Sequence, residues 1–170
     1  MAKQVNVELI GAADENGKMR TPHKIMAELI SKYHKHLKDV RVAIAWRYGW
    51  LEDADGLIRL GQAKKASDLD RQLHNYDFVI LINHEAWNAA EFTEAQMRAL
   101  IDHELCHCEI KVDELGEPII DDTGRVLTRL RKHDVEEFSE VVARNGIWKK
   151  ELEHFAEIAL DKATHPLTAL

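Results

Sequence analysis

His103, Glu104 and His107 belong to the pattern with the most specific chemistry in the sequence, His-Glu-Leu-Cys-His. On a helix, residues four apart lie on one face, one turn from each other, so the two imidazoles can bind one metal ion. Glu104 follows the first histidine and can reach a water molecule at that metal. Zinc lowers the pKa of a water molecule that it binds to about 7, so a carboxylate can take its proton near neutral pH. The pattern therefore predicts a zinc-dependent hydrolase, with His103 and His107 as metal ligands and Glu104 as the general base.

A catalytic zinc ion needs a third protein ligand and keeps its fourth position open for water or substrate. His133 is the first candidate, because the chain after His107 is long enough for a hairpin to return it to the site. Glu136 and Glu137 remain alternatives, since a helix that begins at residue 133 would place them on the face of His133. Asp113 would suit a longer version of the motif, but the turning glycine of that version is missing.

Residues outside the motif are weaker candidates for a role at the site. The tetrahedral oxyanion of an acyl transfer needs a stabiliser besides the metal, and Tyr48, His84 and Arg129 are candidates for it. His84 follows an apolar run and is also a candidate for contact with substrate. Cys106 and Cys108 lie too close in sequence for a disulfide, so we expect both to be free thiols that pack within the fold. The alternative is that a Cys106 thiolate occupies the open position of the zinc ion. The other histidines, His34 and His36 among them, receive no site role.

The elements that must position the motif follow from hydrophobic periodicity and turn residues. We expect strands at 5–10, 40–47, 57–62 and 77–83, two short β segments within 109–131, and helices at 21–37, 93–108, 133–144 and 148–161. Residues 65–75 are ambiguous. Thr21 and Thr93 are the expected helix caps, and Gln96 completes a capping box with Thr93. The predicted fold is α+β, with a small mixed sheet packed against the motif helix and flanking helices.

Composition limits the class of protein. With 170 residues, 45% of them hydrophobic, the chain can bury a core without help from a metal, which leaves a metal site free to be catalytic. We expect a single domain over 1–170, with 148–170 as a C-terminal helix and tail. The net charge of −7 argues against a nucleic-acid partner, and no stretch has the length or apolarity to span a membrane. Two cysteines and no recognisable signal peptide indicate the cytoplasm, or the host cytoplasm for a phage-encoded protein.

The chain resembles the putative phage metallopeptidases, small zincin-like proteins encoded by phages and prophages. The segments that carry the resemblance are Asp77–Asn88, Leu100–Val112 and Lys132–Phe138. The chain also resembles, more distantly, the SprT-type proteases that act on DNA-bound proteins. It lacks the Cys-rich zinc ribbon at the C-terminal end of many of those proteases.

The resemblance implies a zincin-like fold, Zn²⁺ as cofactor and a protein or peptide substrate. It also implies that His103, His107 and His133 are the ligands and that Glu104 is the catalytic residue. Two alternatives stay open. One is a catalytically inactive zincin-like module that binds another protein, and the other is a zinc hydrolase with a non-peptide substrate.

Overall fold

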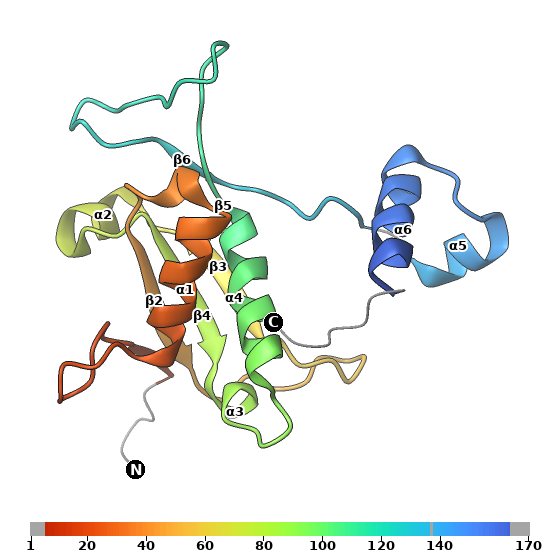
Figure 1. Cartoon of the computed structure of the whole chain (residues 1–170), viewed down its shortest axis with the longest axis horizontal. Coiled ribbons are helices and arrows are strands. Elements are labelled where there is room, and N and C mark those ends of the chain that lie inside the picture. Colours follow the sequence, from red (N-terminus) through yellow and green to blue (C-terminus); the bar gives the residue numbers. More distant parts are fainter. Residues whose placement is uncertain (1–5, 137, 164–170) are drawn as a thin grey trace. The chain divides into compact units, whose positions relative to one another are not determined.

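The computed structural model of the chain describes residues 6–136 and 138–163 (Figure 1). The chain divides into two compact units, Met1–Arg131 and Lys132–Leu170. The organisation as a single domain over 1–170 stays a prediction.

A four-stranded sheet forms the centre of the first unit. Its strands are β1 (Val7–Leu9), β2 (Val42–Arg47), β3 (Gly61–Lys65) and β4 (Phe78–Asn83), in the order β1-β2-β4-β3. β4 pairs parallel to β2 and antiparallel to β3, and β1 pairs antiparallel to β2, so the sheet is mixed. β4 has a neighbour on each side and is almost entirely buried, as its continuous apolar run predicts.

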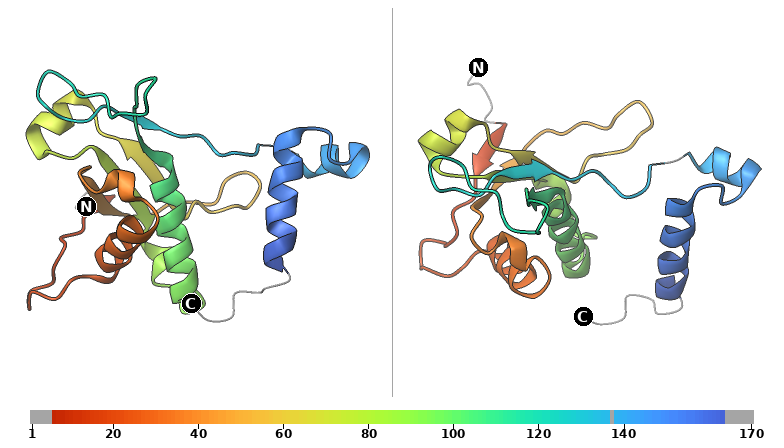
Figure 2. Two further views of the ribbon diagram at one scale, coloured as in Figure 1. Left: turned by 45° about the horizontal axis from the view of Figure 1, so that its top comes forward. Right: turned by 90° about the horizontal axis from the view of Figure 1, so that it is seen from above.

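Helices cover one face of this sheet. The helical elements of the first unit are α1 (Thr21–Lys32), the short 3₁₀ helix η1 (Lys35–Leu37), α2 (Asp68–His74), α3 (His84–Trp87) and α4 (Glu94–His107). α1 and α4 lie side by side on the sheet (Figure 2). The core between these helices and the sheet contains Phe78, Ile80 and Ile82 of β4 with Ile101 and Leu105 of α4, all of them fully buried. Each such side chain contributes about 1.5–3 kcal/mol by leaving water, so the core fixes α4 against the sheet. The predicted α+β fold is confirmed.

α4 begins where the sequence places its cap. The Thr93 hydroxyl accepts from the Gln96 N–H (3.3 Å), and the Gln96 side-chain oxygen accepts from the Thr93 N–H (2.9 Å). This capping box satisfies two N–H groups that the first turn of a helix leaves without a partner. The helix ends at His107, because Cys108 is already extended and opens the next strand. The motif therefore occupies the last turns of α4.

A long hairpin follows α4. β5 (Cys108–Ile110) pairs antiparallel to β6 (Thr128–Leu130), with Cys108 opposite Leu130. Two bridges, Val112 with Pro118 and Ile120 with Val126, each close a short turn within the segment that joins the two strands. The hairpin therefore returns the chain to the C-terminal end of α4, as the sequence predicts.

Several boundaries differ from those expected. α1 ends at Lys32 rather than near residue 37, and its N-cap is Arg20, so Thr21 is the first helical residue and not the cap. The ambiguous stretch 65–75 contains β3's end and α2, which Ser67 and Asp70 stabilise through a capping box. β3 lies at Gly61–Lys65, displaced from the expected 57–62. Such errors arise because tertiary pairing, and not local pattern alone, sets where an element starts and ends.

The second unit contains α5 (Ser139–Asn145) and α6 (Lys150–Ala163). The expectation of a helix from residue 133 is wrong: residues 132–136 are not helical, and α5 begins only at Ser139. His133 and Glu136 therefore do not share a helical face. No apolar stripe runs through these residues, and short helices without a packed face are marginal in water. α5 ends before Gly146, whose φ of 70° suits a residue without a side chain.

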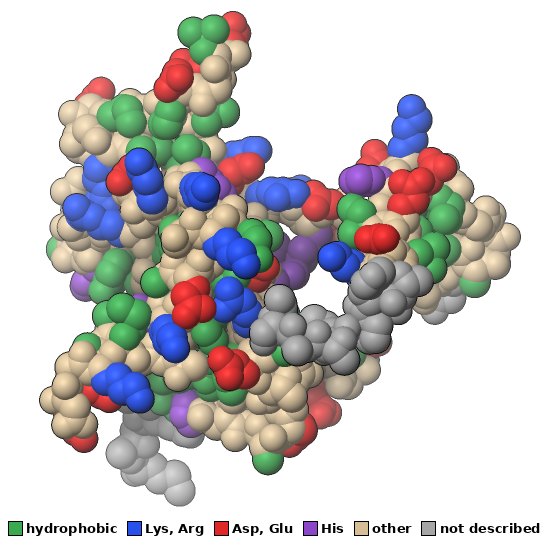
Figure 3. Space-filling view, viewed as in Figure 1, with side chains coloured by type: hydrophobic (Ala, Val, Ile, Leu, Met, Phe, Trp, Pro, Cys, Tyr) green, Lys and Arg blue, Asp and Glu red, His purple; other side chains and the backbone are tan. Residues whose placement is uncertain are grey.

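Among the described residues, no helix is long and apolar enough to cross a membrane. Figure 3 shows Lys and Arg side chains dispersed among acidic and apolar ones on the visible face of the first unit.

Candidate metal centre

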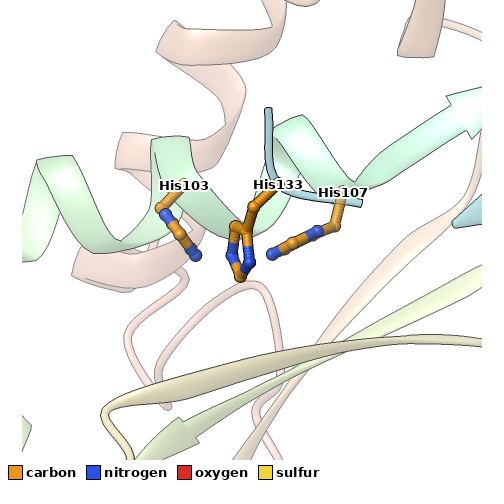
Figure 4. A group of neighbouring side chains, drawn as sticks. All are labelled: His103, His107 and His133. Carbon is orange, nitrogen blue, oxygen red and sulfur yellow. The ribbon is translucent and has the colours of Figure 1, made fainter. Parts of the chain in front are cut away.

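His103 and His107 project from the same side of α4 (Figure 4). Their ring centroids lie 5.0 Å apart, with the ring planes at 80°. Two imidazoles bound to one zinc ion at Zn–N distances of about 2.0–2.1 Å, with tetrahedral angles, have ring centres on the order of 5 Å apart. The spacing of the two rings therefore fits a shared metal ion.

The His107 ring is oriented by the hairpin. Its Nδ1 lies 2.7 Å from the carbonyl oxygen of Arg131, and the Arg131 N–H donates to the carbonyl of His107 (2.9 Å). A carbonyl oxygen only accepts, so Nδ1 carries the hydrogen, and Nε2 is the atom with a lone pair for a metal. Metal-binding histidines in proteins usually donate their second ring N–H in this way, which fixes the tautomer and the ring.

His133 follows Arg131 by two residues, at the start of the second unit. Consecutive Cα atoms are about 3.8 Å apart, so the Cα of His133 lies within about 8 Å of the Cα of Arg131 whatever the intervening dihedral angles. Because Arg131 is hydrogen-bonded to His107, the covalent chain alone keeps His133 in the neighbourhood of that residue. The assignment of His103, His107 and His133 as ligands stays a prediction.

Glu104 is buried, in contrast to the exposed His103, and its side chain lies against β3. Burial raises the pKa of its carboxyl group, while the Ala63 N–H, the charge of Arg59 and, when its ring is protonated, the charge of His107 oppose that shift. A base that is held away from bulk water and ionises nearer to neutral pH is better matched to proton transfer than an exposed carboxylate.

The hydrogen-bond pattern of β3 explains how its edge reaches Glu104. The Leu60 carbonyl accepts from Asn83 (2.8 Å) and the Ala66 N–H donates to Asp77 (2.9 Å), so the even-numbered residues pair with β4. In an antiparallel pair the alternate residues direct their N–H and C=O groups to the opposite side. Ala63 is one of these alternate residues, and its N–H favours the ionised form of Glu104 and so lowers the pKa of that carboxyl group.

Gly61 allows this contact. A Cβ atom at that position would lie 2.6 Å from Oε1 of Glu104 and 3.0 Å from Cδ1 of Leu100. Both distances are too short, so a side chain at position 61 would displace the carboxylate. The sequence analysis did not select Gly61. Its only signal is a glycine inside a strand, which marks close approach of another group.

A pocket of about 390 Å³ lies between α4 and β3. Its lining is mostly apolar, with His103 and Glu104 as its ionisable groups. The lining residues are Leu60, Gly61, Phe92, Gln96, Ala99, Leu100, His103 and Glu104. A mostly apolar hollow with a few polar groups is typical of a ligand site.

The structure assigns other contacts to several residues that the sequence proposed. The Asp113 carboxylate accepts from the N–H groups of Leu115 (2.8 Å) and Glu117 (2.9 Å), so it holds a hairpin turn. Glu136 is exposed, and its carbonyl accepts from Lys149. Glu137 lies outside the described residues.

The three candidates for oxyanion stabilisation also have partners. The Tyr48 hydroxyl donates to Glu8 (2.7 Å), which raises its pKa. His84 contacts Tyr48 at a ring-centroid distance of 4.5 Å, and Arg129 forms an ion pair with Glu109. Tyr48, His84 and Arg129 are not among the residues that line the pocket, so a role for them in catalysis stays a prediction.

The two cysteines differ in their surroundings. Cys108 is buried, its thiol lies 3.5 Å from the Glu104 carbonyl, and burial raises its pKa to about 12. Cys106 is exposed on α4. His34, to which the sequence analysis gave no role, is buried and bonded to Asp102 at 2.6 Å.

Comparison with known protein families gives one match. The model of the family described as "Putative phage metallopeptidase" matches residues 18–156, which is most of the chain and includes the whole motif. No curated protein and no solved structure matches the chain. The chain therefore belongs to the putative phage metallopeptidase family.

Proposed function

We propose that this protein is a zinc-dependent peptidase with a zincin-like arrangement, in which Glu104 is the general base. The observation that carries the proposal is the position of Glu104. Its carboxyl group lies against Gly61 of β3 at the edge of the sheet and lines the same pocket as His103. Membership of the metallopeptidase family supports a hydrolytic use of that geometry.

His103, His107 and His133 are the residues that would hold the zinc ion. Each offers one ring nitrogen, and a site of three imidazoles suits Zn²⁺. The spacing of the first two rings and the bond from His107 to Arg131 support their part in the set. When bound, zinc supplies Lewis acidity, which polarises a scissile carbonyl and makes a water molecule more acidic.

The chain's own residues perform the proton transfers. Glu104 takes a proton from the attacking water as the bond to the carbonyl carbon forms. It then gives that proton to the amine nitrogen as the peptide bond breaks. The Ala63 N–H faces the carboxylate and favours its ionised form without acting as an acid, and Gly61 leaves room for the carboxylate against β3.

The lining of the pocket supports a proposal for the part of a substrate that would bind there. Leu60, Phe92 and Leu100 give it an apolar lining, which favours an apolar side chain next to the scissile bond. A peptide that runs along the outer edge of β3 would meet the backbone groups of Gly61 and Lys65, on either side of Ala63. Added-strand binding of this kind gives affinity through the main chain and selectivity through pockets for side chains.

The variant Glu104→Gln tests the proposal, with the zinc content and the cleavage of a mixed peptide library measured on the same sample. Loss of a positioned base costs about 10²- to 10⁴-fold, so we expect cleavage to fall by at least 10²-fold while zinc stays bound. Glu94→Gln, at the exposed start of the same helix, is the matched control and should cleave as the wild type does.

Cleavage that survives Glu104→Gln would contradict the assignment of the base. A wild-type protein that retains zinc but cleaves none of the library would favour the alternatives, a hydrolase of non-peptide substrates or an inactive binding module. Small ester and amide substrates then separate those two, since only a hydrolase turns them over.

A further inference from the structure

A second group of side chains that can bind a metal lies next to the first. Two of its members lie on α4, and each precedes one of the two motif histidines by one residue. His34 follows the end of α1, and Asp102 and Cys106 are four apart on α4. Each of the three offers one ligand atom, and these atoms lie within 4.8 Å of one another. The first unit contains all three residues.

We infer that His34, Asp102 and Cys106 form a second metal site, which binds a zinc-type divalent ion where the chain leaves α1. The inference goes beyond the proposed peptidase activity and does not depend on it.

The chemistry of the three ligands selects the metal. An imidazole, a carboxylate and a thiolate together suit Zn²⁺, which accepts nitrogen, oxygen and sulfur, and they suit Ca²⁺ and Mg²⁺ poorly because those ions prefer oxygen. At zinc's usual bond lengths, tetrahedral ligand atoms lie about 3.4–3.6 Å apart. The observed 2.6 Å from His34 Nε2 to the Asp102 carboxylate would widen slightly, and the Cys106 sulfur would move inward.

The surroundings make this a built site rather than a chance surface group. The side chain of His34 is only 8% exposed, while that of Asp102 is 44% exposed, so one ligand is buried and another is accessible to an ion from solvent. The neighbouring His36 is engaged elsewhere, with its Nε2 3.3 Å from the Cys108 carbonyl. An ion pair between Glu28 and Arg98 (2.9 Å) joins α1 to α4 on the same side of the sheet.

A metal at this site would have a structural consequence. It would cross-link the end of α1 to the helix that carries His103 and His107, through ligands that lie far apart in the sequence. Such a link stabilises the folded chain, because the unfolded chain does not present the three ligands together.

Cobalt titration of the full-length apo-protein tests the inference, because a thiolate bound to Co²⁺ adds a charge-transfer absorption in the near ultraviolet. We expect this absorption to grow as the wild type takes up two equivalents of Co²⁺, one for each site, and to vanish in Cys106→Ser. Asp102→Asn and His34→Asn should weaken the binding that produces it by at least about tenfold. Cys108→Ala is the matched control and should keep the absorption.

A double variant, His103→Ala with His107→Ala, separates this site from the proposed catalytic one, because it should retain the thiolate absorption. Loss of the absorption in that variant would mean that Cys106 serves the first site, and the inference would be overturned. No thiolate absorption in the wild type, or its survival in Cys106→Ser, would overturn it equally. Thermal melts of each variant show that the chain is folded, and the absorption is read without reference to peptide cleavage.

Discussion

Two neighbouring strips of α4 carry pairs of metal-binding side chains at the same spacing, yet their partners come from different places. His103 and His107 lie on the strip beside the pocket, and His107 is oriented by the returning hairpin at Arg131. Asp102 and Cys106 lie on the next strip, and their partner is His34 after α1. The spacing of four residues makes a metal site available on either strip, but what the rest of the fold brings to the strip decides its chemistry.

The strips differ most in the residue that follows the first ligand of each pair. The residue after His103 is Glu104, a buried carboxylate that contacts β3, whereas the residue after Asp102 is the exposed His103. A base, a pocket and two imidazoles are the components of hydrolysis. The other group resembles a structural link. The comparison is therefore open to tests that affect one strip and leave the other intact.

The largest effect is expected from His107→Ala. Removing a ligand removes Lewis acidity worth several kcal/mol, so kcat/KM for a cleaved peptide should fall by at least about 10³-fold, together with the zinc bound at the first site. His74→Ala, a histidine on the exposed surface of α2, is the control. A His107→Ala protein with more than a tenth of wild-type cleavage would rule out this histidine as a ligand.

Gly61→Ala should have the next largest effect. The added Cβ would meet Oε1 of Glu104 at 2.6 Å and push the carboxylate from its place. A displacement of about 1 Å in a catalytic group costs on the order of 10²-fold, and we expect this loss in kcat with zinc still bound. The control is Gly11→Ala, where a Cβ would make only an ordinary contact of 3.6 Å. Equal cleavage by the two variants would show that the approach of Glu104 to β3 is unimportant.

A smaller effect concerns stability and sharpens the contrast between the strips. Excess zinc at about 100 times its Kd stabilises a folded chain by about 2.7 kcal/mol per site, and about 1 kcal/mol raises the Tm of a protein of this size by roughly 2–4 °C. Asp102→Asn should remove about half of the zinc-dependent rise in Tm, and adding His107→Ala should remove the rest. A rise that Asp102→Asn leaves whole would show that only one strip binds metal.

The smallest effect belongs to the hairpin that orients His107. Hydrogen bonds from the Thr123 hydroxyl and the Arg125 N–H lower the pKa of Asp121 to about 2. An unfolded aspartate has a pKa of about 3.9, so the stabilisation from Asp121 is complete above that pH and is lost as the pH falls toward about 2. Asp121→Asn should therefore lower the Tm at neutral pH, and the difference from wild type should shrink in acid. Asp122→Asn, its exposed neighbour, is the control; a difference independent of pH would contradict this origin.

The sequence predicts much of this arrangement because the relevant signals are local. The capping box of Thr93 and Gln96, the helical spacing of His103 and His107 and the apolar run of β4 each lie within a few residues. Local patterns of this kind agree with the fold because natural sequences are consistent across levels.

The rest depends on contacts between residues far apart in sequence. Gly61 matters because Glu104 approaches it, and His34 matters because Asp102 does. Neither contact follows from a periodic pattern that can be read in a single sequence. The expected helix at 133–144 starts only at Ser139 for a related reason, since residues 132–136, polar apart from Val135, lack the apolar stripe that would hold a helix in place.

Anomalous scattering at the zinc edge, from crystals grown with zinc at neutral pH, tests the central claim most directly. Our account predicts a peak bound by the Nε2 of His107, by His103 and by His133, with an open position facing Glu104. The absence of any peak bound by both His103 and His107, or the closure of that peak by a fourth protein ligand, would contradict a catalytic zinc site.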